Sequence, residues 1–417
     1  MEIKREKYLK ALTNRMHNGM IKVITGIRRC GKSYLLFKIF KNYLKEIHIS
    51  DDHIIEIALD ERKNKNYRNP DVLLDYVENK ITDSALYYLL LDEVQLLDEF
   101  EEVLNSLLHI SNLDIYVTGS NSRFLSKDII TEFRGRGDEI HVFPLTFKEY
   151  MQGYSGDTYH GFADYIMYGG LPLILSMKTE EQKVEYLTRL FEETYIKDIR
   201  ERNRIDKVQE LNDLINVLAS AVGSLTNPSK IEATFKSKLH SDISINTIRQ
   251  YIAFLQDAFV IHEAQRFDVK GRKYIGSPLK YYFEDIGLRN ARLGFRQHEE
   301  THLMENILYN ELRARGFSVD VGVVPIRKTV SSGERERSQL EIDFIATLGS
   351  RKYYIQSAFS LPDAEKIKQE KTPLLNVGDS FKKIIIVHDT LNIRRDDDGI
   401  TTMNIYDFLL NEHSLDM

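Results

Sequence analysis

The segment from Gly26 to Ser33 constrains the fold of this chain more than any other feature. It reads Gly-Ile-Arg-Arg-Cys-Gly-Lys-Ser and matches the pattern G-x-x-x-x-G-K-[ST] at every position. A short β-branched run, 21–25, precedes the segment, and apolar residues at helical spacing, 34–40, follow it. A strand, a glycine-containing loop and a helix in this order predict a loop whose backbone N–H groups surround a phosphate.

Each part of this loop has an expected role. Gly26 and Gly31 permit backbone angles that turn N–H groups inward. Lys32 can reach the β- and γ-phosphates of a nucleotide, and Ser33 offers a hydroxyl to Mg²⁺. The expected nucleotide-binding set is Gly26, Ile27, Arg28, Arg29, Cys30, Gly31, Lys32, Ser33 and Tyr34.

Two residues in the middle of the loop are open to more than one interpretation. Arg28 and Arg29 can bind phosphate or a partner, or only face solvent. Cys30 fits a small loop residue better than a redox switch.

An acid pair stands further along the chain. Asp92 and Glu93 follow the apolar run 89–91, which is typical of a buried strand. A carboxylate at such a strand end is costly unless a cation pairs with it, so Asp92 is assigned to Mg²⁺. Glu93 is placed to orient or deprotonate the attacking water. The alternative is that both acids are simply exposed to solvent. The phosphate loop earlier in the chain makes this the less favoured interpretation.

Two more positions are candidates for the γ-phosphate. Ser120 and Asn121 follow the strand pattern 113–117, and the carboxyl ends of parallel strands face the ligand crevice. Either residue can sense the γ-phosphate, although a helix cap explains them equally well. Arg136 lies between two glycines and can reach the γ-phosphate of a neighbouring subunit, which is worth about 10³–10⁵ in rate. The alternative is a basic turn exposed to solvent, and the local sequence taken by itself favours this alternative over a role at the γ-phosphate.

Strand and helix patterns alternate through the first part of the chain, which predicts an α/β fold. The strands form a parallel sheet with helices on both faces, as in P-loop NTPases. The remainder of the sequence predicts a helical and winged-helix region, followed by a C-terminal α/β domain. The expected segments are a P-loop core at 1–150, a helical lid at 151–215, a winged helix-turn-helix-like region at 216–296 and a nuclease-like fold at 297–417.

Composition limits the setting. The 417 residues carry a formal charge of −6, and Cys30 is the only cysteine, so no internal disulfide is possible. The longest apolar run, 85–91, is far shorter than the roughly 18 residues of a membrane span. No signal peptide is evident at the N-terminus. We therefore expect a cytoplasmic protein without a membrane partner, in which any contact with nucleic acid requires a local basic surface.

Residues 226–296 provide such a surface. They contain twelve Lys and Arg against seven Asp and Glu, a net charge of +5 in a chain that is acidic overall. Two helix patterns, 228–239 and 246–259, flank a turn, and the basic stretch 268–273 resembles a wing. The candidate DNA contacts are Asn246, Thr247, Arg249, Gln250, Lys270, Arg272 and Lys273. A helical domain that only packs against its neighbours is the alternative.

The C-terminal segment resembles the PD-(D/E)xK nuclease fold. Glu305 on a helix and Asp343 in a strand match its metal-binding acids. Gln356 replaces the third acid with a neutral, weaker ligand, and Ala358 stands where the lysine is expected. The segment is therefore interpreted as a degenerate nuclease fold that can still hold DNA, and an active nuclease is the less favoured case.

Taken in order, these segments resemble the AAA-type P-loop ATPases of archaea and bacteria that carry a C-terminal domain of unknown function. The resemblance covers nearly the whole chain. It rests on residues 24–33, 91–93, 118–121, 135–136, 143–150, 169–172, 280–288, 305–306 and 341–344.

This resemblance implies ATP as the nucleotide, Ser120 as a sensor and Arg136 as a finger. Self-association into an oligomer is expected with it. The expected function is hydrolysis of Mg·ATP coupled to DNA binding or remodelling. The alternatives are a nucleotide-controlled switch that engages a protein partner and, less favoured, an ATP-dependent nuclease.

Overall fold

The computed structural model of the protein describes residues 3–119, 135–329 and 335–417, and no side chain between 328 and 336 is described. The chain packs into two compact units. The first comprises Met1–Leu145 with Leu171–Leu173 and Asp257–Phe259, and the remainder forms the second. The first unit therefore ends close to the limit of 150 expected for the P-loop core.

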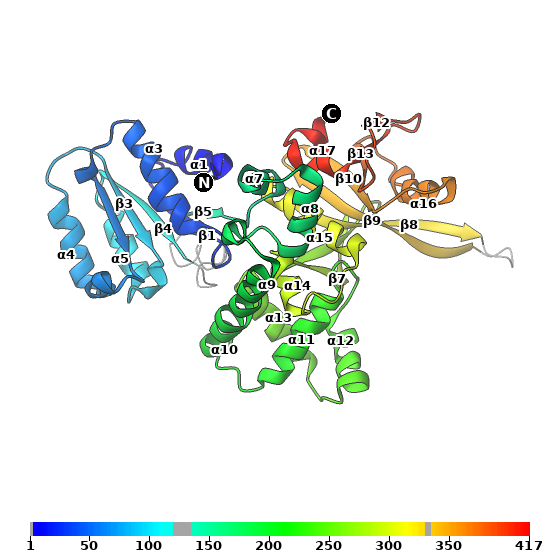
Figure 1. The fold of residues 1–417 in the computed structure, drawn as a ribbon, viewed down its shortest axis with the longest axis horizontal. Coiled ribbons are helices and arrows are strands. Elements are labelled where there is room, and N and C mark those ends of the chain that lie inside the picture. Colours follow the sequence, from blue (N-terminus) through cyan, green and yellow to red (C-terminus); the bar gives the residue numbers. More distant parts are fainter. Residues whose placement is uncertain (1–2, 120–134, 330–334) are drawn as a thin grey trace. The chain divides into compact units, whose positions relative to one another are not determined.

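A five-stranded parallel sheet is the centre of the first unit (Figure 1). Its order is β2-β3-β4-β1-β5. The strands are β1 (Ile21–Thr25), β2 (Ile54–Ala58), β3 (Tyr87–Asp92), β4 (Leu113–Thr118) and β5 (Gly137–His141). Every pairing among them is parallel, which confirms the predicted sheet.

Helices cover both faces of this sheet. They are α1 (Glu6–Thr13), α2 (Lys32–Tyr34), η1 (Leu35–Phe40), α3 (Lys41–Glu46), η2 (Asp51–His53), η3 (Arg62–Arg68), α4 (Pro70–Lys80), η4 (Val94–Leu96) and α5 (Phe100–Leu107). Apolar residues of α4 and α5 form one core with the strands. On the other face the ring of Phe40 lies 4.5 Å from that of Tyr116. Parallel strands need such crossover helices, because their ends lie at opposite edges of the sheet.

Helices dominate the first part of the second unit. They are α7 (Phe147–Gly153), α8 (Thr158–Tyr168), η6 (Pro172–Ser176), α9 (Glu180–Arg189), η7 (Leu190–Ile196), α10 (Lys197–Asn203), α11 (Val208–Ser220), α12 (Pro228–Thr234), η8 (Phe235–Leu239) and α13 (Ile245–Asp257). The helical character expected for 151–215 is present, and α11 continues past the expected limit to Ser220.

A mixed eight-stranded sheet completes the second unit, in the order β12-β13-β11-β10-β9-β8-β6-β7. Its strands are β6 (Ile261–Asp268), β7 (Lys273–Phe283), β8 (Ser318–Thr329), β9 (Arg335–Leu348), β10 (Arg351–Ala358), β11 (Lys382–Val387), β12 (Arg394–Arg395) and β13 (Ile400–Asn404). The accompanying helices are α14 (Ile286–Arg292), α15 (Glu300–Ala314), α16 (Ala364–Leu375), α17 (Ile405–Leu410) and η9 (Ser414–Asp416).

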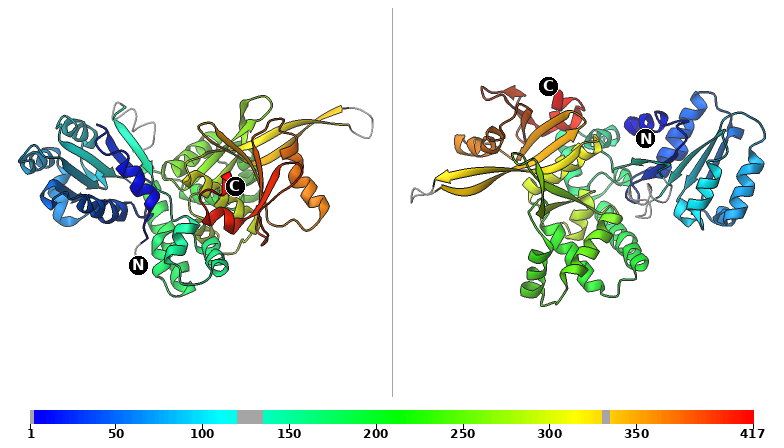
Figure 2. Two further views of the ribbon diagram at one scale, coloured as in Figure 1. Left: turned by 90° about the horizontal axis from the view of Figure 1, so that it is seen from above. Right: turned by 180° about the vertical axis from the view of Figure 1, so that it is seen from behind.

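This sheet joins two segments that the sequence suggested as separate. Strand β6 pairs with β8 in parallel, so hydrogen bonds run across the expected limit at 296. Strands β8 and β9 form a long hairpin, whose pairing continues to Thr329 and Arg335. Figures 1 and 2 show these two strands extending beyond the rest of their sheet.

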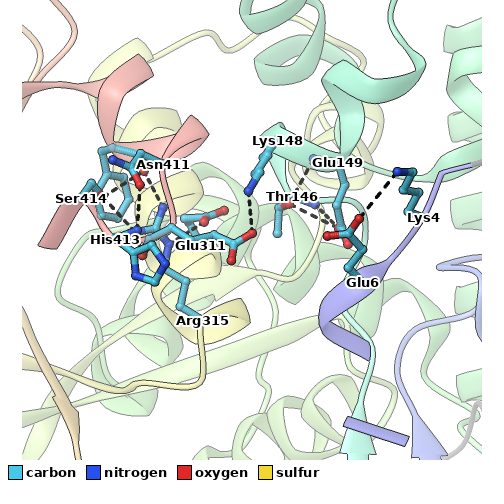
Figure 3. Close-up of polar contacts among 12 residues, drawn as sticks. Lys4, Glu6, Thr146, Lys148, Glu149, Glu311, Arg315, Asn411, His413 and Ser414 are labelled. Carbon is cyan, nitrogen blue, oxygen red and sulfur yellow. Dashed lines mark hydrogen bonds and ion pairs between the residues drawn. The ribbon is translucent and has the colours of Figure 1, made fainter. Parts of the chain in front are cut away.

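Polar contacts hold the beginning of the second unit to its end. Lys148 Nζ on α7 lies 2.8 Å from Glu412 Oε1, and Arg315 donates from Nη1 to Ser414 Oγ at 3.0 Å (Figure 3). The C-terminal residues are therefore part of this unit. Among the described residues, no helix combines the length and the apolar character that a bilayer crossing requires.

Candidate functional site

The phosphate loop follows β1 and begins the helix α2. Gly26 has φ 136° and Gly31 has φ 104°, both in the region that favours glycine. A Cβ atom on Gly26 would lie 2.2 Å from the carbonyl oxygen of Val142, so no larger residue fits there. Among the described residues Gly31 has no such close neighbour, and the backbone angle is what requires a glycine there. The two glycines thus have the conformations that the motif predicts.

Lys32 lies across the loop. Its side chain is only 5% exposed, and Nζ donates to the carbonyl oxygens of Gly26 and Ile27, each at 2.9 Å. A buried ammonium group needs such acceptors, because burial without them is costly.

The remaining loop side chains differ in exposure. Ile27 and Cys30 are fully buried, which agrees with a structural role for the thiol. Arg29 and Tyr34 are exposed, and Arg28 is half-buried. These last three side chains form the outer rim of the loop.

Asp92 ends β3 beside the loop, as predicted. Its side chain is 4% exposed and accepts a hydrogen bond from the Thr118 hydroxyl. Burial raises the pKa of Asp92, and the nearby hydroxyls of Thr118 and Ser33 oppose that rise. The structure therefore brings Ser33 and Asp92 together, where a cation would compensate the buried carboxylate.

Glu93 adopts a left-handed backbone conformation with φ 54° immediately after β3. Its N–H donates to Thr118 Oγ1 at 3.0 Å, and Gln95 donates through Nε2 to Glu93 Oε2. One buried hydroxyl, that of Thr118, thus contacts both members of the acid pair. Sequence reasoning missed Thr118, although the pairing of β3 with β4 could have placed it beside Asp92.

Arg136 lies away from the phosphate loop of its own chain. It is exposed, and its carbonyl oxygen accepts from the N–H of Ile21 at 2.8 Å, at the start of β1. The loop follows the other end of this strand, about 13 Å further at the usual rise per residue. Within one chain, this geometry does not bring Arg136 to the phosphates. Ser120 and Asn121 lie outside the described residues.

The helix pattern expected at 246–259 corresponds to α13, which ends at Asp257. Its buried residues are Ile248, Tyr251, Ile252 and Leu255. Asn246, Arg249 and Gln250 are exposed on it. The Thr247 hydroxyl is hydrogen-bonded to Ser244 Oγ at 2.9 Å, where the helix begins. Three of the four candidate side chains are therefore available to a ligand, and the fourth is hydrogen-bonded to Ser244, whose Oγ also accepts from the Thr247 N–H at the start of the helix.

The predicted wing is the turn between β6 and β7, where Lys270, Arg272 and Lys273 are exposed. Asp268 Oδ1 accepts from the N–H groups of Lys270 and Gly271 and shapes this turn. Lys270 Nζ donates to the carbonyl oxygen of Pro325 at 3.0 Å. The wing therefore rests on β8 of the mixed sheet.

The three positions expected for a degenerate nuclease site come together in the second unit. Glu305 on α15, Asp343 on β9 and Gln356 on β10 are near one another, and the Asp343 N–H donates to Gln356 Oε1 at 3.3 Å. A lysine from β7 joins them. Lys280 Nζ lies 2.8 Å from Glu305 Oε1, 2.8 Å from Glu341 Oε1 and 3.8 Å from Asp343 Oδ1.

The charges in this cluster depend on one another. Burial favours neutral Lys280, but the carboxylates of Glu305, Asp343 and Glu341 together raise its pKa. Burial and the charge of Glu305 raise the pKa of Asp343, while Lys280 lowers it. The ammonium group thus lies where the acids converge. Sequence reasoning missed Lys280 and Glu341, although Glu341 is two residues before Asp343 and shares its face of the strand.

A phosphate loop after one strand of a parallel sheet, with an acid pair at the end of another, defines the first unit as a P-loop nucleotide-binding domain. Residues 18–151 match a family model described as an AAA domain, and residues 159–299 match a domain of unknown function (DUF8612). An uncharacterized protein of Haemophilus influenzae is 32% identical over 414 residues, covering 98% of either chain. The chain belongs to this family of AAA-domain P-loop proteins, which confirms the resemblance seen in the sequence.

More distant relatives add little about activity. An uncharacterized protein of Methanocaldococcus jannaschii is 28% identical over 385 residues, covering 88% of this chain and 80% of its own. Among solved structures, the Aeropyrum pernix ORC1 protein in complex with DNA is 11% identical, with a TM-score of 0.30 over 70% of this chain and 92% of that one. The Candida albicans Pif1 helicase is 14% identical, with a TM-score of 0.26 over 46% and 47%. Similarities this low support no conclusion about function.

Proposed function

We propose that this protein binds and hydrolyses Mg·ATP and couples that cycle to DNA binding or remodelling. The observation that carries the nucleotide part is the meeting of Ser33, Asp92 and Thr118 beside the phosphate loop. A hydroxyl and a carboxylate are the oxygen donors that Mg²⁺ prefers. The buried Asp92 carboxylate gains most from such a cation, because no lysine or arginine of the described residues is hydrogen-bonded to it.

Each residue of the phosphate loop and the acid pair fits a particular role in binding Mg·ATP. The N–H groups between Gly26 and Lys32 hold the phosphates, and the Lys32 amine turns from its carbonyl acceptors toward them. Ser33 and Asp92 hold the metal, directly or through water. When bound, Mg²⁺ neutralises charge that develops on the phosphate oxygens.

Glu93 is the proposed base of the reaction. Gln95 fixes its carboxylate, and Thr118 fixes its backbone. In this position Glu93 orients a water molecule toward the γ-phosphate and accepts its proton. Arg136 serves the site of a neighbouring subunit, which requires an oligomer, since within one chain it lies at the far end of β1.

The DNA part of the proposal rests on exposed basic side chains of the second unit. Arg249 on α13 and the wing residues Lys270, Arg272 and Lys273 face solvent. Such side chains supply the phosphate contacts that dominate affinity for DNA.

The test is the rate of ATP hydrolysis by the purified protein with and without duplex, single-stranded and branched DNA. Glu93→Gln is the matched variant, since it keeps shape and loses the base. We expect Mg²⁺-dependent turnover that DNA changes, and a Glu93→Gln protein that still binds ATP but does not hydrolyse it. Absence of ATP binding at millimolar nucleotide would refute the nucleotide part. Turnover indifferent to every DNA form, together with a protein that co-purifies, would instead support the nucleotide-controlled switch.

A further inference from the structure

A basic groove lies at the base of the β8–β9 hairpin in the second unit. Its volume is about 720 Å³, within the usual range of ligand sites. The lining includes Lys270, Pro325, Arg327, Arg337, Gln339 and Asn376. The wing turn and the projecting hairpin therefore form one surface, although more than fifty residues of chain separate Lys270 from Arg327.

Two arginines of this groove face each other across the hairpin. Arg327 on β8 is directly opposite Arg337 on β9, and both are exposed. Opposite residues of antiparallel strands have Cβ atoms about 5 Å apart, and like charges at that distance destabilise the pair. Within the described part of the chain, neither guanidinium is in an ion pair with a carboxylate. An anion between them would turn this repulsion into attraction.

A third arginine, on β6, is buried and contacts a residue that lines the groove. Arg266 is 9% exposed, and its Nη2 donates to Gln339 Oε1 at 3.1 Å. Its Nε has no hydrogen-bond partner among the described residues. A buried guanidinium that contacts a neutral amide in place of a carboxylate is poorly compensated. Arg266 therefore adds positive potential to the groove, and part of its donor capacity is unused.

We propose that this groove binds successive phosphates of a nucleic-acid strand. The proposal rests on the proposed DNA function and names the surface that carries it. Lys270 of the wing turn lines the groove together with Arg327 and Arg337, and Arg266 contacts Gln339 of the same lining. Asp268, the acid of that turn, is already occupied by backbone N–H groups. A single phosphate cannot neutralise four cations, whereas a polyanion that follows the groove can.

The test is binding of fluorescein-labelled oligonucleotides, single-stranded and duplex, followed by fluorescence anisotropy from about 50 to 200 mM salt. The variant is Arg327→Gln/Arg337→Gln. The matched control is Arg394→Gln/Arg395→Gln, which removes two exposed arginines from β12, the opposite end of the same sheet order. Removal of a like-charged exposed pair should not lower the melting temperature, and this is measured for both variants.

We expect the Arg327→Gln/Arg337→Gln protein to bind about tenfold more weakly, with a salt slope lower by about 2, because each phosphate contact contributes about 1 to the slope. The control should retain the affinity and slope of the unmodified protein. If the two variants bind DNA with equal affinity and equal salt slope, the groove is not the DNA-binding surface. The proposed DNA function would be unaffected by that result. If the unmodified protein binds no oligonucleotide at the lowest salt, the DNA function fails and the inference with it. If the Arg327→Gln/Arg337→Gln protein loses binding of tripolyphosphate but keeps its binding of DNA, the groove is a small-anion site. That result would also overturn the inference.

Discussion

The hydroxyl of Thr118 gives the sharpest test of the nucleotide site, because one atom contacts both acids. It donates to the Asp92 carboxylate and accepts from the Glu93 N–H at 3.0 Å. Thr118 is fully buried, so water cannot replace either hydrogen bond after substitution. Thr118→Val removes the hydroxyl with almost no change of shape.

The size of the effect follows from these two contacts. A hydrogen bond to a charged group contributes about 1.5–3 kcal/mol, and one to a backbone N–H about 1 kcal/mol. Substitution of groups that orient metal ligands typically costs about 10–100-fold in metal affinity. We therefore expect the Mg²⁺ concentration for half-maximal ATP hydrolysis to rise about 10–100-fold in Thr118→Val.

The substitution should also change how the Mg²⁺ requirement for ATP hydrolysis depends on pH. Burial already raises the pKa of Asp92, and loss of the Thr118 hydrogen bond removes one of the two contacts that lower it. More of the carboxylate is then protonated at a given pH, so the Mg²⁺ requirement of Thr118→Val should increase as the pH falls. The assay is ATP hydrolysis against Mg²⁺ concentration at several pH values. Thr118→Ser, which keeps the hydroxyl, is the control, and an unchanged Mg²⁺ requirement in Thr118→Val would refute the reasoning.

Three further predictions concern other parts of the chain. Arg136→Ala should reduce turnover by about 10³-fold or more, and mixing it with Lys32→Ala protein should restore part of the rate; no restoration would contradict action across subunits. Lys280→Met leaves three neighbouring acids without their cation and should cost about 3–5 kcal/mol of unfolding free energy, which millimolar Mg²⁺ should partly restore in thermal melts. Burial raises the pKa of Asp285 to about 6 against 3.8 in an unfolded chain, so its contribution to stability is present below about pH 4 and is lost as the pH rises through 6. Asp285→Asn should therefore gain up to about 3 kcal/mol relative to the unmodified protein between pH 4 and 8, as measured by denaturant unfolding, and a difference constant with pH would contradict this.

The conformation of the phosphate loop and the place of Asp92 at the end of β3 could be predicted from the sequence because their determinants are local. The phosphate loop is a strand, a turn and a helix within a short stretch, and each residue type is required by its own backbone angle or charge. Asp92 was predictable because a carboxylate at the end of a buried strand needs a cation. Thr118 was missed because its role depends on which strand lies beside β3, and that pairing is not a local property.

Segment limits were predicted less well in the C-terminal half. The wing hairpin was expected from its turn residues, and it is present between β6 and β7. The parallel pairing of β6 with β8 was not foreseen, since it joins strands that are far apart in sequence. Such pairing depends on the twist and packing of the whole sheet, which no window of residues contains. The basic groove beside Arg327 is a consequence of this pairing.

The nuclease-like cluster shows most clearly why spacing alone fails. The lysine expected near Gln356 is absent, since that position is Ala358. Lys280 supplies the ammonium group from β7, although β6 and β8 lie between β7 and β9 in the sheet order. The pairing of β6 with β7 shifts register next to Ala264, the partner of Lys280, and a bulge of this kind bends and twists its strands. An electrostatic role requires only that the ammonium group reach the acids. The lysine that supplies it can therefore stand at a different position in the sequence while the cluster keeps the same charges.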